Sequence, residues 1–309
     1  MPELPEVEFA RRGLTEWLLG RTVARVRVAD ERALGRGRTE EEVAAALEGG
    51  TVTDVARRGK WLRFALDSGE LVFSHLGMTG KWVARPTDAP PERFEKIRFD
   101  LVEGAAANAK DAKNAKNAVR AAGAGAKKSA GAGRKKKQKP HETGATSSVR
   151  YRDPRLLGQF IVTRSDIATW RSLGPDPLLD GVDVERLAAR LAKRSLSIKQ
   201  VLLDQKVLAG IGNIQATEAL FIARIHPERL ANDLSAKEVK ALARAITASI
   251  DRTLALEAGP EITYVEESRA KNPFPIYGHG GEPCPRCKAP LTRIVHGGRG
   301  TVFCARCQT

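Results

Sequence analysis

The four cysteines of the chain lie in two C-x-x-C pairs near its C-terminal end, Cys284 with Cys287 and Cys304 with Cys307. In a cytosolic protein, pairs with this spacing indicate a metal site before a disulfide. Two intervening residues let both thiolates of a pair face one ion, and the sixteen residues between the pairs fall in the range of zinc ribbons. Because four thiolates leave no open coordination position, we predict one structural Zn²⁺ that fixes the hairpin between the pairs.

The predicted hairpin carries an arginine among glycines, in the stretch His296-Gly-Gly-Arg299-Gly. An arginine at a rigid, glycine-rich tip can approach a phosphate closely. An ordinary solvated arginine gives the same pattern, and the spacing alone favours that second interpretation.

The chain is strongly basic, with a formal net charge of +15. Residues 105–148 supply nine Lys and two Arg against one Asp and one Glu, a net of +9, which leaves +6 for the rest. Basic character in both parts favours a polyanionic partner, nucleic acid first. Val119 is the one large apolar residue of this Lys-rich segment, so we predict a disordered insertion. It is either a solvated linker or an arm that adds non-specific phosphate contacts.

Hydrophobic periodicity divides the chain into a strand-rich part and a helical part. A helix is predicted over Pro5–Leu19, followed by short strands that include a hairpin over 60–77 turning at residues 67–69. The strand pattern resumes beyond the Lys-rich segment, which therefore lies in a loop between two strands of one sheet. From Asp183 the period becomes helical, and the predicted fold class is α+β.

The first residues, MPELPEVE, contain more than a helix start requires. Pro5 and the later carboxylates suit a first helical turn. Removal of Met1 would make Pro2 a secondary amine with the carboxylate of Glu3 beside it. An α-amine has a reference pKa of about 8, so a useful fraction is neutral near pH 7. Such an amine can attack a sugar C1′ or an aldehyde to form an iminium, with Glu3 as the proton donor.

Two weaker signals lie elsewhere in the chain. Gly210 and Gly212 permit a tight turn before a helix that opens at Asn213, and the free N–H groups there can bind a DNA phosphate. A plain interhelical turn has the same sequence. Lys60 begins a predicted strand after two arginines and a glycine, where a lysine is usually a surface charge.

Together these pieces resemble the formamidopyrimidine-DNA glycosylase / endonuclease VIII family over nearly the whole chain apart from the Lys-rich segment. The family's motifs occur in the family's order: PELPEVE, RRGKWL, HLGMTG, RDPR, DQKVLAGIGNIQATEALF, IYG, GGEPC and the terminal zinc ribbon. The start PELPE is similar to the formamidopyrimidine branch, because the endonuclease VIII branch typically starts PEGPE.

The resemblance implies a bifunctional DNA glycosylase with AP lyase activity that flips the damaged nucleotide out of the duplex. Pro2 would be the nucleophile on C1′, and Glu3 would protonate the opening sugar ring. The resulting iminium acidifies the C2′ proton, so β- and then δ-elimination cut both sides of the lost nucleoside. Lys60 would contact phosphates beside the lesion and assist the elimination, and Arg299 would grip the flanking phosphates.

Other positions match the family's motifs as well. Lys199 and Asn213 correspond to phosphate-binding positions of the helix-two-turn-helix, and Glu6 and Glu218 correspond to acidic positions near the pocket.

Three side chains of the family fill the gap left by the flipped base, and here Met78 and Arg155 match the first two. The third is commonly Phe, whereas this chain has Leu157, an apolar wedge that stacks less well on a base. In addition, residues 259–275 look shorter than the loop that closes over 8-oxoguanine in the formamidopyrimidine branch. The resemblance implies removal of oxidised purines (formamidopyrimidines, 8-oxoguanine). The short loop argues against a preference for 8-oxoguanine and leaves formamidopyrimidines or, with the same chemistry, oxidised pyrimidines open.

The resemblance and the periodicity together predict four parts. These are an N-terminal catalytic β-sandwich domain over 1–165 with the insertion at 105–148, a linker over 166–182, a helix-two-turn-helix domain over 183–270 and a zinc finger over 271–309. We expect a monomer that binds double-stranded DNA with oxidised bases or abasic sites. No apolar run approaches the ~20 residues of a membrane span, so the expected location is the bacterial cytoplasm, at the nucleoid. A zinc-finger DNA-binding protein without catalysis is the alternative of another class, and the Pro2–Glu3–Lys60 set speaks against it.

Overall fold

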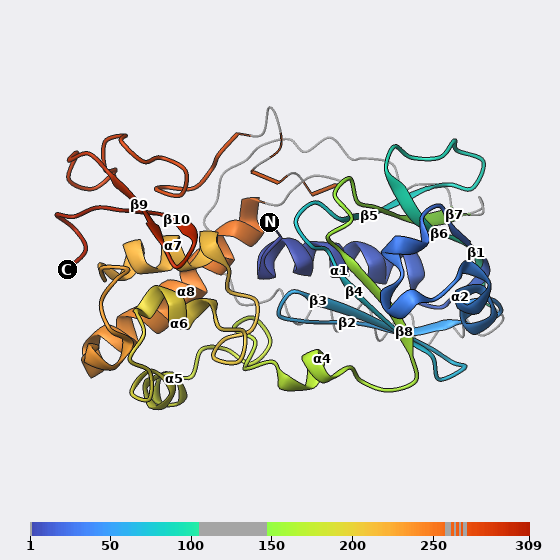
Figure 1. The fold of residues 1–309 in the computed structure, drawn as a ribbon, viewed down its shortest axis with the longest axis horizontal. Helices are drawn as coiled ribbons and strands as arrows, with labels where there is room; N and C mark the ends of the chain where they lie inside the picture. Colours follow the sequence, from blue (N-terminus) through green and yellow to red (C-terminus); the bar gives the residue numbers. More distant parts are fainter. Residues whose placement is uncertain (1, 105–146, 257–260, 263, 266, 268–270) are drawn as a thin grey trace, which may run out of the picture.

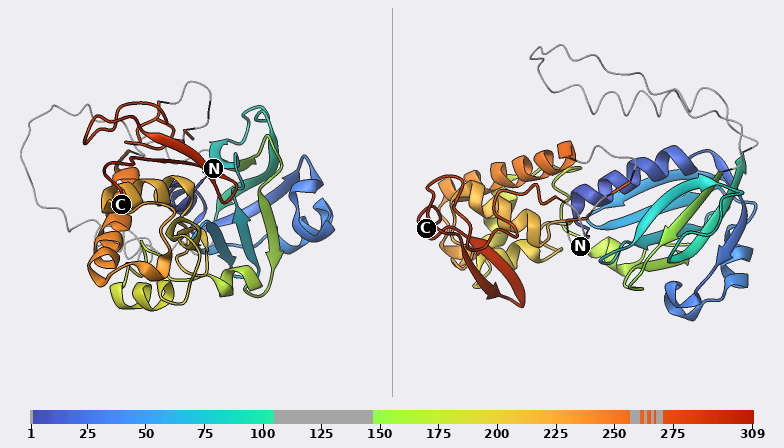
Figure 2. Two further views of the ribbon diagram at one scale, coloured as in Figure 1. Left: turned by 60° about the vertical axis from the view of Figure 1, so that its left-hand side comes forward. Right: turned by 90° about the horizontal axis from the view of Figure 1, so that it is seen from above.

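The computed structural model describes residues 2–104, 147–256, 261–262, 264–265, 267 and 271–309. A β-sandwich lobe and a helical lobe lie side by side, and helix α1 (Leu4–Leu18) begins at the junction between them (Figure 1). The C-terminal hairpin lies on the helical lobe (Figure 2). The predicted disordered insertion over 105–148 lies outside the described residues except for Ser147 and Ser148, where the prediction is wrong because both belong to a strand.

Two four-stranded antiparallel sheets form the sandwich. One has the order β1 (Arg21–Val28), β6 (Glu95–Glu103), β7 (Ser147–Arg152), β5 (Lys81–Pro86), and the other the order β2 (Val52–Arg58), β3 (Trp61–Leu66), β4 (Leu71–His75), β8 (Gln159–Thr163). Val26 and Phe99 of the first sheet and Phe64 and Val72 of the second are buried in one hydrophobic cluster. The predicted β-sandwich is therefore confirmed.

The connections of the sandwich follow the turn signals of the sequence. Strands β3 and β4 pair as a hairpin, and Gly69 in its turn has φ +85°, a left-handed conformation that glycine adopts without strain. Strands β6 and β7, which flank the Lys-rich segment, pair directly with each other. The prediction that this segment joins two strands of one sheet is confirmed.

Helix α1 begins with a capping box. The backbone N–H of Glu3 donates to the Glu6 carboxylate at 2.8 Å, while Pro5 occupies the first turn, where a missing N–H costs nothing. Val7, Leu14 and Leu18 on one face are buried in the sandwich core. The packing of this face against the sandwich fixes the helix, so its first turn is held at the junction of the lobes.

The helical lobe contains α5 (Val184–Leu191), α6 (Ile198–Leu203), α7 (Asn213–Ala223) and the long α8 (Ala236–Leu256). Two further helices, α2 (Glu40–Leu47) in the sandwich lobe and α4 (Ala168–Ser172) in the linker, were not predicted, and short 3₁₀ turns lie at Glu31–Ala33, Gly35–Gly37 and Ala231–Asp233. Within the described ranges, none of the helices has both the length and the apolar character that crossing a membrane requires.

The C-terminal hairpin consists of β9 (Thr292–His296) and β10 (Arg299–Phe303). Its two-residue turn is Gly297-Gly298, with φ +57° and +74°, the positive pair that a tight hairpin with a type I′ turn requires. Arg299 therefore follows the tip directly. Leu291 and Val302 pack with Phe221 of α7, which attaches the hairpin to the helical lobe.

Candidate active site at the junction of the lobes

The carboxylate of Glu3 is bound by the N-terminus of helix α7. It accepts backbone N–H bonds from Gly212 at 3.0 Å, Ile214 at 2.7 Å and Gln215 at 2.9 Å, and it is 1% exposed. A helix N-terminus presents free N–H groups and a positive dipole end, so it stabilises an anion. The sequence predicted a DNA phosphate at these amides. That prediction is wrong for these three groups, because a carboxylate of the protein itself occupies them.

Two glycines make this close approach possible. A Cβ on Gly212 would lie 2.3 Å from Cδ of Glu3, and a Cβ on Gly210 would lie 2.7 Å from Cβ of Leu4. Gly210 also has φ +96°, and its carbonyl accepts the N–H of Leu4 at 3.0 Å. The G-x-G sequence is thus needed for docking of the helix α1 start, which carries Pro2 and Glu3, onto the helical lobe.

Pro2 is buried at the same junction, one residue before Glu3. Since Glu3 and Leu4 are each bonded to the 210–215 turn, Pro2 lies beside the N-terminus of α7. The structure therefore brings Pro2, Glu3 and the turn before Asn213 together from two distant parts of the chain.

Lys60 lies in the turn between β2 and β3 and faces the same region. Burial lowers the pKa of Lys60 from its ordinary value, and the charge of Arg299 adds to this effect. The carboxylates of Glu3 and Glu6 oppose it. Lys60 of the sandwich lobe and Arg299 of the hairpin are therefore close enough for their positive charges to repel each other. The Arg299 side chain is exposed.

Lys199 and Asn213 hold the hairpin against the helical lobe. Nζ of Lys199 donates to Oγ1 of Thr301 at 2.6 Å, and Nδ2 of Asn213 donates to the carbonyl of Gly300 at 3.0 Å. Burial is the main cause that lowers the pKa of Lys199 to about 8; Arg299 acts in the same direction, and Glu3 acts against it. Lys199 is 1% exposed, so its ammonium is bonded within the protein, close to the expected phosphate-binding surface.

Met78, Arg155 and Leu157, the predicted wedge residues, lie on two neighbouring loops at the surface. Met78 is 37% exposed and Leu157 is 45% exposed, so both side chains are accessible to a partner. Asp153 joins the loops, because its carboxylate accepts from Oγ1 of Thr79 at 2.8 Å and from the backbone N–H groups of residues 155 and 158 at 3.2 and 2.8 Å. Asp153 thus holds together the two loops that carry the three side chains.

Sequence reasoning did not single out Asp153 or Gln215. The side chain of Gln215 donates to Oγ1 of Thr253 at 2.9 Å and accepts from Oγ of Ser249 at 2.7 Å, which anchors α7 to α8 directly behind the Glu3 carboxylate. The turn-forming Asp-Pro pair in the sequence could have indicated the role of Asp153. No local pattern could have indicated that of Gln215, since its partners are on another helix.

The two further acidic positions differ in their surroundings. Glu6 belongs to the capping box of α1 and acts on Lys60. Glu218 lies on α7, and its Oε1 accepts the N–H groups of Ile276 at 3.0 Å and Tyr277 at 2.8 Å. Burial raises the pKa of Glu218 despite these two bonds. Its visible contacts fix the segment that leads to the C-terminal hairpin.

The four cysteines converge on one point. All four Sγ atoms lie within 4.8 Å of one another, with Cys284–Cys307 at 4.0 Å and Cys287–Cys304 at 3.4 Å. Tetrahedral Zn²⁺ with bonds of about 2.3 Å separates its sulfurs by about 3.8 Å, so the cluster fits the ion. No other group of metal ligands is found within the described part of the chain. The predicted zinc site is confirmed as a four-thiolate structural site.

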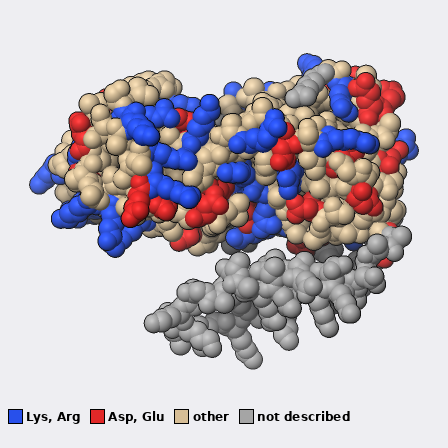
Figure 3. Space-filling view, turned by 90° about the horizontal axis from the view of Figure 1, so that it is seen from below, with Lys and Arg blue, Asp and Glu red and all other residues tan. Residues whose placement is uncertain are grey.

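Basic side chains accompany the site on the surface. On the face in Figure 3, Lys and Arg side chains are spread over both lobes, with Asp and Glu among them. Since the chain outside residues 105–148 carries a net +6, a polyanion can contact both lobes without the Lys-rich segment.

Three family models match the chain. They are the formamidopyrimidine-DNA glycosylase N-terminal domain over residues 1–117, the formamidopyrimidine-DNA glycosylase H2TH domain over 173–264, and a zinc finger found in FPG and IleRS over 281–309. The fold and the site therefore define the class of helix-two-turn-helix DNA glycosylases with a zinc finger.

Similar proteins agree over the full length. Formamidopyrimidine-DNA glycosylases of Halalkalibacterium halodurans and Geobacillus kaustophilus are 33% and 34% identical over 316 residues, which cover 100% of both chains in each pair. Lactococcus lactis Fpg in complex with DNA that contains an abasic site aligns with a TM-score of 0.76 at 27% identity, over 99% of each chain. The chain belongs to the formamidopyrimidine-DNA glycosylase family. It is a base-excision repair glycosylase with AP lyase activity and acts on DNA, as the motifs predicted.

Proposed function

We propose that Pro2, freed by removal of Met1, is the nucleophile of this glycosylase and that Glu3 is its proton shuttle. The observation that carries the proposal is the bond set of Glu3. Its carboxylate is fixed beside Pro2 by three backbone N–H groups at 2.7–3.0 Å. A carboxylate that is already held next to the reacting amine can transfer a proton without first having to adopt the right orientation.

The proposed chemistry balances as follows. The Pro2 nitrogen donates its electron pair to C1′, and the C1′–base bond breaks with its electron pair leaving on the base, which takes a proton. Glu3 takes up the N–H proton that the Pro2 nitrogen loses on attack and passes it to the sugar O4′ as the ring opens, and C1′ becomes an iminium. Loss of the C2′ proton then expels the 3′ phosphate, and a second elimination expels the 5′ phosphate. Water releases the sugar fragment and regenerates the amine.

Lys60, Arg299, Asn213 and Lys199 would hold the DNA backbone around the lesion. Support comes from their convergence on one junction with cationic or amide donors, the groups that bind phosphates. Burial lowers the pKa of Lys60, and its amine would assist the elimination from its place beside the Pro2–Glu3 end of helix α1. We assign Met78, Arg155 and Leu157 to the gap left by the flipped nucleotide.

The substrate class that we propose is DNA with oxidised purines, in particular formamidopyrimidines. The name of the relatives supports this, and Lactococcus lactis Fpg has been solved with DNA that contains N7-benzyl-Fapy-dG. Oxidised pyrimidines are a second candidate, because the same Lactococcus lactis protein has been solved with DNA that contains an oxidised pyrimidine. The smaller wedge Leu157 is compatible with a broader choice of lesion and opposite base.

We further propose the domain limits 1–165, 166–182, 183–270 and 271–309, and a monomer located in the bacterial cytoplasm at the nucleoid. The bacterial sources of the relatives support this location.

Borohydride trapping tests the proposal. The protein is incubated with duplexes that carry 8-oxoguanine opposite C, a formamidopyrimidine or thymine glycol, and a covalent adduct reports the iminium. We expect adducts at least with the purine lesions, and sequencing of the N-terminus should begin at Pro2. Pro5→Ala is the matched control, because it changes the same helix start but not the amine.

A retained Met1, or trapping that persists when Pro2 is replaced by an acetylated residue, would count against Pro2 as the nucleophile. The pattern among the three lesions then decides between purines and pyrimidines as the preferred class.

A further inference from the structure

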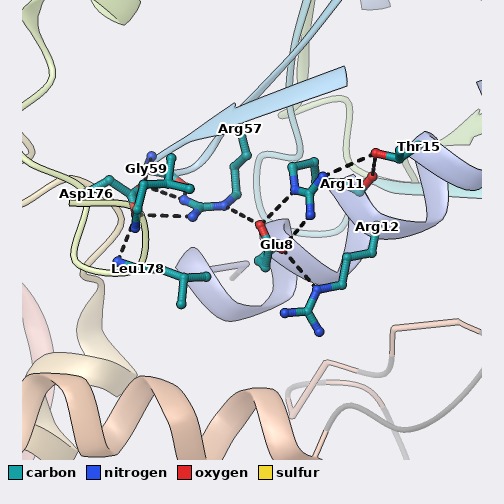
Figure 4. Close-up of polar contacts among 9 residues, drawn as sticks. Glu8, Arg11, Arg12, Thr15, Arg57, Gly59, Asp176 and Leu178 are labelled. Atoms are coloured by element: carbon teal, nitrogen blue, oxygen red, sulfur yellow. Dashed lines mark hydrogen bonds and ion pairs between the residues drawn. The ribbon is translucent and has the colours of Figure 1, made fainter. Parts of the chain in front are cut away.

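A buried carboxylate of the linker lies directly behind the turn that carries Lys60. The side chain of Asp176 is 0% exposed. Its Oδ2 accepts the N–H of Gly59 at 2.7 Å and one Nη of Arg57, and its Oδ1 accepts the other Nη at 3.1 Å (Figure 4). The backbone N–H groups of Leu178 and Leu179 complete the set at 3.0 and 3.1 Å.

This bond set leaves Asp176 no capacity for a substrate. A carboxylate has about four lone-pair sites, and five donors already point at its two oxygens. The acid is therefore not a candidate for proton transfer. Asp176 instead fixes geometry, because its two oxygens bind both the linker at Leu178 and Leu179 and the turn before Lys60.

Arg57 extends the arrangement to helix α1. Besides Asp176, its guanidinium donates to the carbonyl of Gly59 at 3.1 Å and to Oε2 of Glu8 at 3.0 Å. Gly59 thus has its N–H bound by Asp176 and its C=O bound by Arg57. Glu8 is itself held by Arg11 and Arg12 on the same helix (Figure 4).

The contacts form a continuous connection between the two parts of the site. One end is Gly59, the residue before Lys60. The other is Glu8, less than two helical turns after Glu3 on α1. Gly59 also packs closely on the turn that binds Glu3, since a Cβ there would lie 3.1 Å from the backbone N of Gly210. Small shifts of the Gly59 turn would therefore change the position of Lys60 relative to Pro2.

Stability alone is a weak explanation for such a network. Buried ion pairs lose much of their Coulomb energy to desolvation, and apolar replacements of similar size are often as stable. The two bonds to the backbone of Gly59 are the part that an apolar core would not provide.

We propose that Asp176 is a positioning residue for Lys60: through Gly59 and Arg57 it fixes the distance between Lys60 and the Pro2–Glu3 end of helix α1. This inference rests on the proposed role of Lys60 and deepens it.

The test is a double-mutant cycle on the elimination step, with Asp176→Asn, Lys60→Gln and the combined variant. The full-length enzyme, in saturating amount over a duplex with a preformed abasic site, is followed through a single turnover. Affinity for an uncleavable abasic-site analogue is measured separately. Asp180→Asn is the matched control, because this exposed acid of the same linker contacts the backbone of Asp176 but neither Arg57 nor Gly59.

We expect Asp176→Asn to slow elimination by about ten- to a hundredfold, as a misplaced catalytic group does, with affinity changed less than about threefold. In the Lys60→Gln background the same change should have an effect of less than about twofold, because the group that it positions is gone. Asp180→Asn should behave as wild type. The Asp176→Asn pH–rate profile should also lose the ionisation that Lys60→Gln removes.

Equal effects of Asp176→Asn in both backgrounds, or a wild-type rate, would overturn the inference. A wild-type rate for Lys60→Gln would instead refute the proposed role of Lys60, so the two failures are distinguishable. If Asp176→Asn does not fold, the pair Arg57→Met/Asp176→Leu removes both charges together, and the same cycle is run with it.

Discussion

The Glu3 carboxylate lies 2.7 Å from the backbone nitrogen of Ile214, although 210 residues separate the two in sequence. Together with the bonds from the N–H groups of Gly212 and Gln215, this bond caps the N-terminus of helix α7 in the helical lobe. The capping residue, Glu3, stands at the start of helix α1 in the sandwich lobe. The chain end that carries Pro2 and Glu3 is thus oriented by the helical lobe, and the lobes cannot separate without releasing it.

Glu3→Gln should separate base removal from strand cleavage. The amide has one oxygen for the three N–H groups and no acidic proton to deliver to O4′, so we expect removal of a damaged base to fall at least about 100-fold. A preformed abasic site already contains an open-chain aldehyde, and its cleavage should fall much less. Single-turnover assays on the two duplexes measure both rates.

Glu16→Gln, an exposed change on the same helix, is the control for Glu3→Gln and should leave both rates unchanged. Equal losses of the two activities in Glu3→Gln would contradict the assignment.

Gly212→Ala should displace Glu3 without straining the backbone. The residue has φ −123°, which alanine adopts freely, but the added Cβ would lie 2.3 Å from Cδ of Glu3. We therefore expect loss of base removal comparable to that of Glu3→Gln, in a protein that remains folded. Circular dichroism and the lesion-cleavage assay check this.

Gly49→Ala is the complementary control, because no heavy atom of the described residues lies within 4 Å of its Cβ while its φ is +81°. It should cost about 1–2 kcal/mol of stability with unchanged activity. Normal excision by Gly212→Ala would show that the carboxylate need not occupy the α7 terminus.

Local signals in the sequence predicted most of the fold. The helix predicted over Pro5–Leu19 is observed at Leu4–Leu18, and the Cys spacing predicted the metal cluster. Helix α2 was missed although Thr39 and Glu42 form a capping box, a signal present in the sequence. What local pattern cannot provide is the partner of a buried charge. The spacing of residues predicts neither the binding of Glu3 by helix α7 nor the binding of Arg57 by Asp176, because both depend on packing between segments that are distant in sequence.

Cys304→Ser should remove zinc and weaken DNA binding while the sandwich stays folded. With the cluster broken, the hairpin loses its fixed tip, and with it the bonds of Lys199 to Thr301 and of Asn213 to Gly300. We expect a loss of affinity of at least about tenfold, since these contacts position the groups that we propose to bind phosphates. Metal analysis and fluorescence anisotropy with a lesion duplex measure the two effects.

The tryptophans provide an internal control for this variant, because all four lie within the first 170 residues. Their emission should be unchanged in Cys304→Ser, and zinc added back to a chelated wild-type protein should restore affinity. Tight DNA binding by metal-free protein would refute a positioning role for the hairpin.

His75 should make the protein less stable in mildly acidic solution. Burial, and next the charge of Lys60, lower the pKa of His75 to about 4, and its Nδ1 accepts the N–H of Gly77 at 3.1 Å, as a neutral ring does. The unfolded chain takes up the proton near pH 6.5 and the folded protein only near pH 4. The stabilisation is therefore complete above pH 6.5, declines as the pH falls, and is lost below pH 4. At one pKa unit per 1.36 kcal/mol, it amounts to at most about 3 kcal/mol.

Urea unfolding at pH 7 and pH 4.5 should show a larger loss of unfolding free energy for wild type than for His75→Gln, whose side chain does not titrate. Because other acidic groups contribute equally to both proteins, the difference between the two losses isolates His75. Parallel losses would mean that the imidazole is charged in the folded protein, next to Lys60.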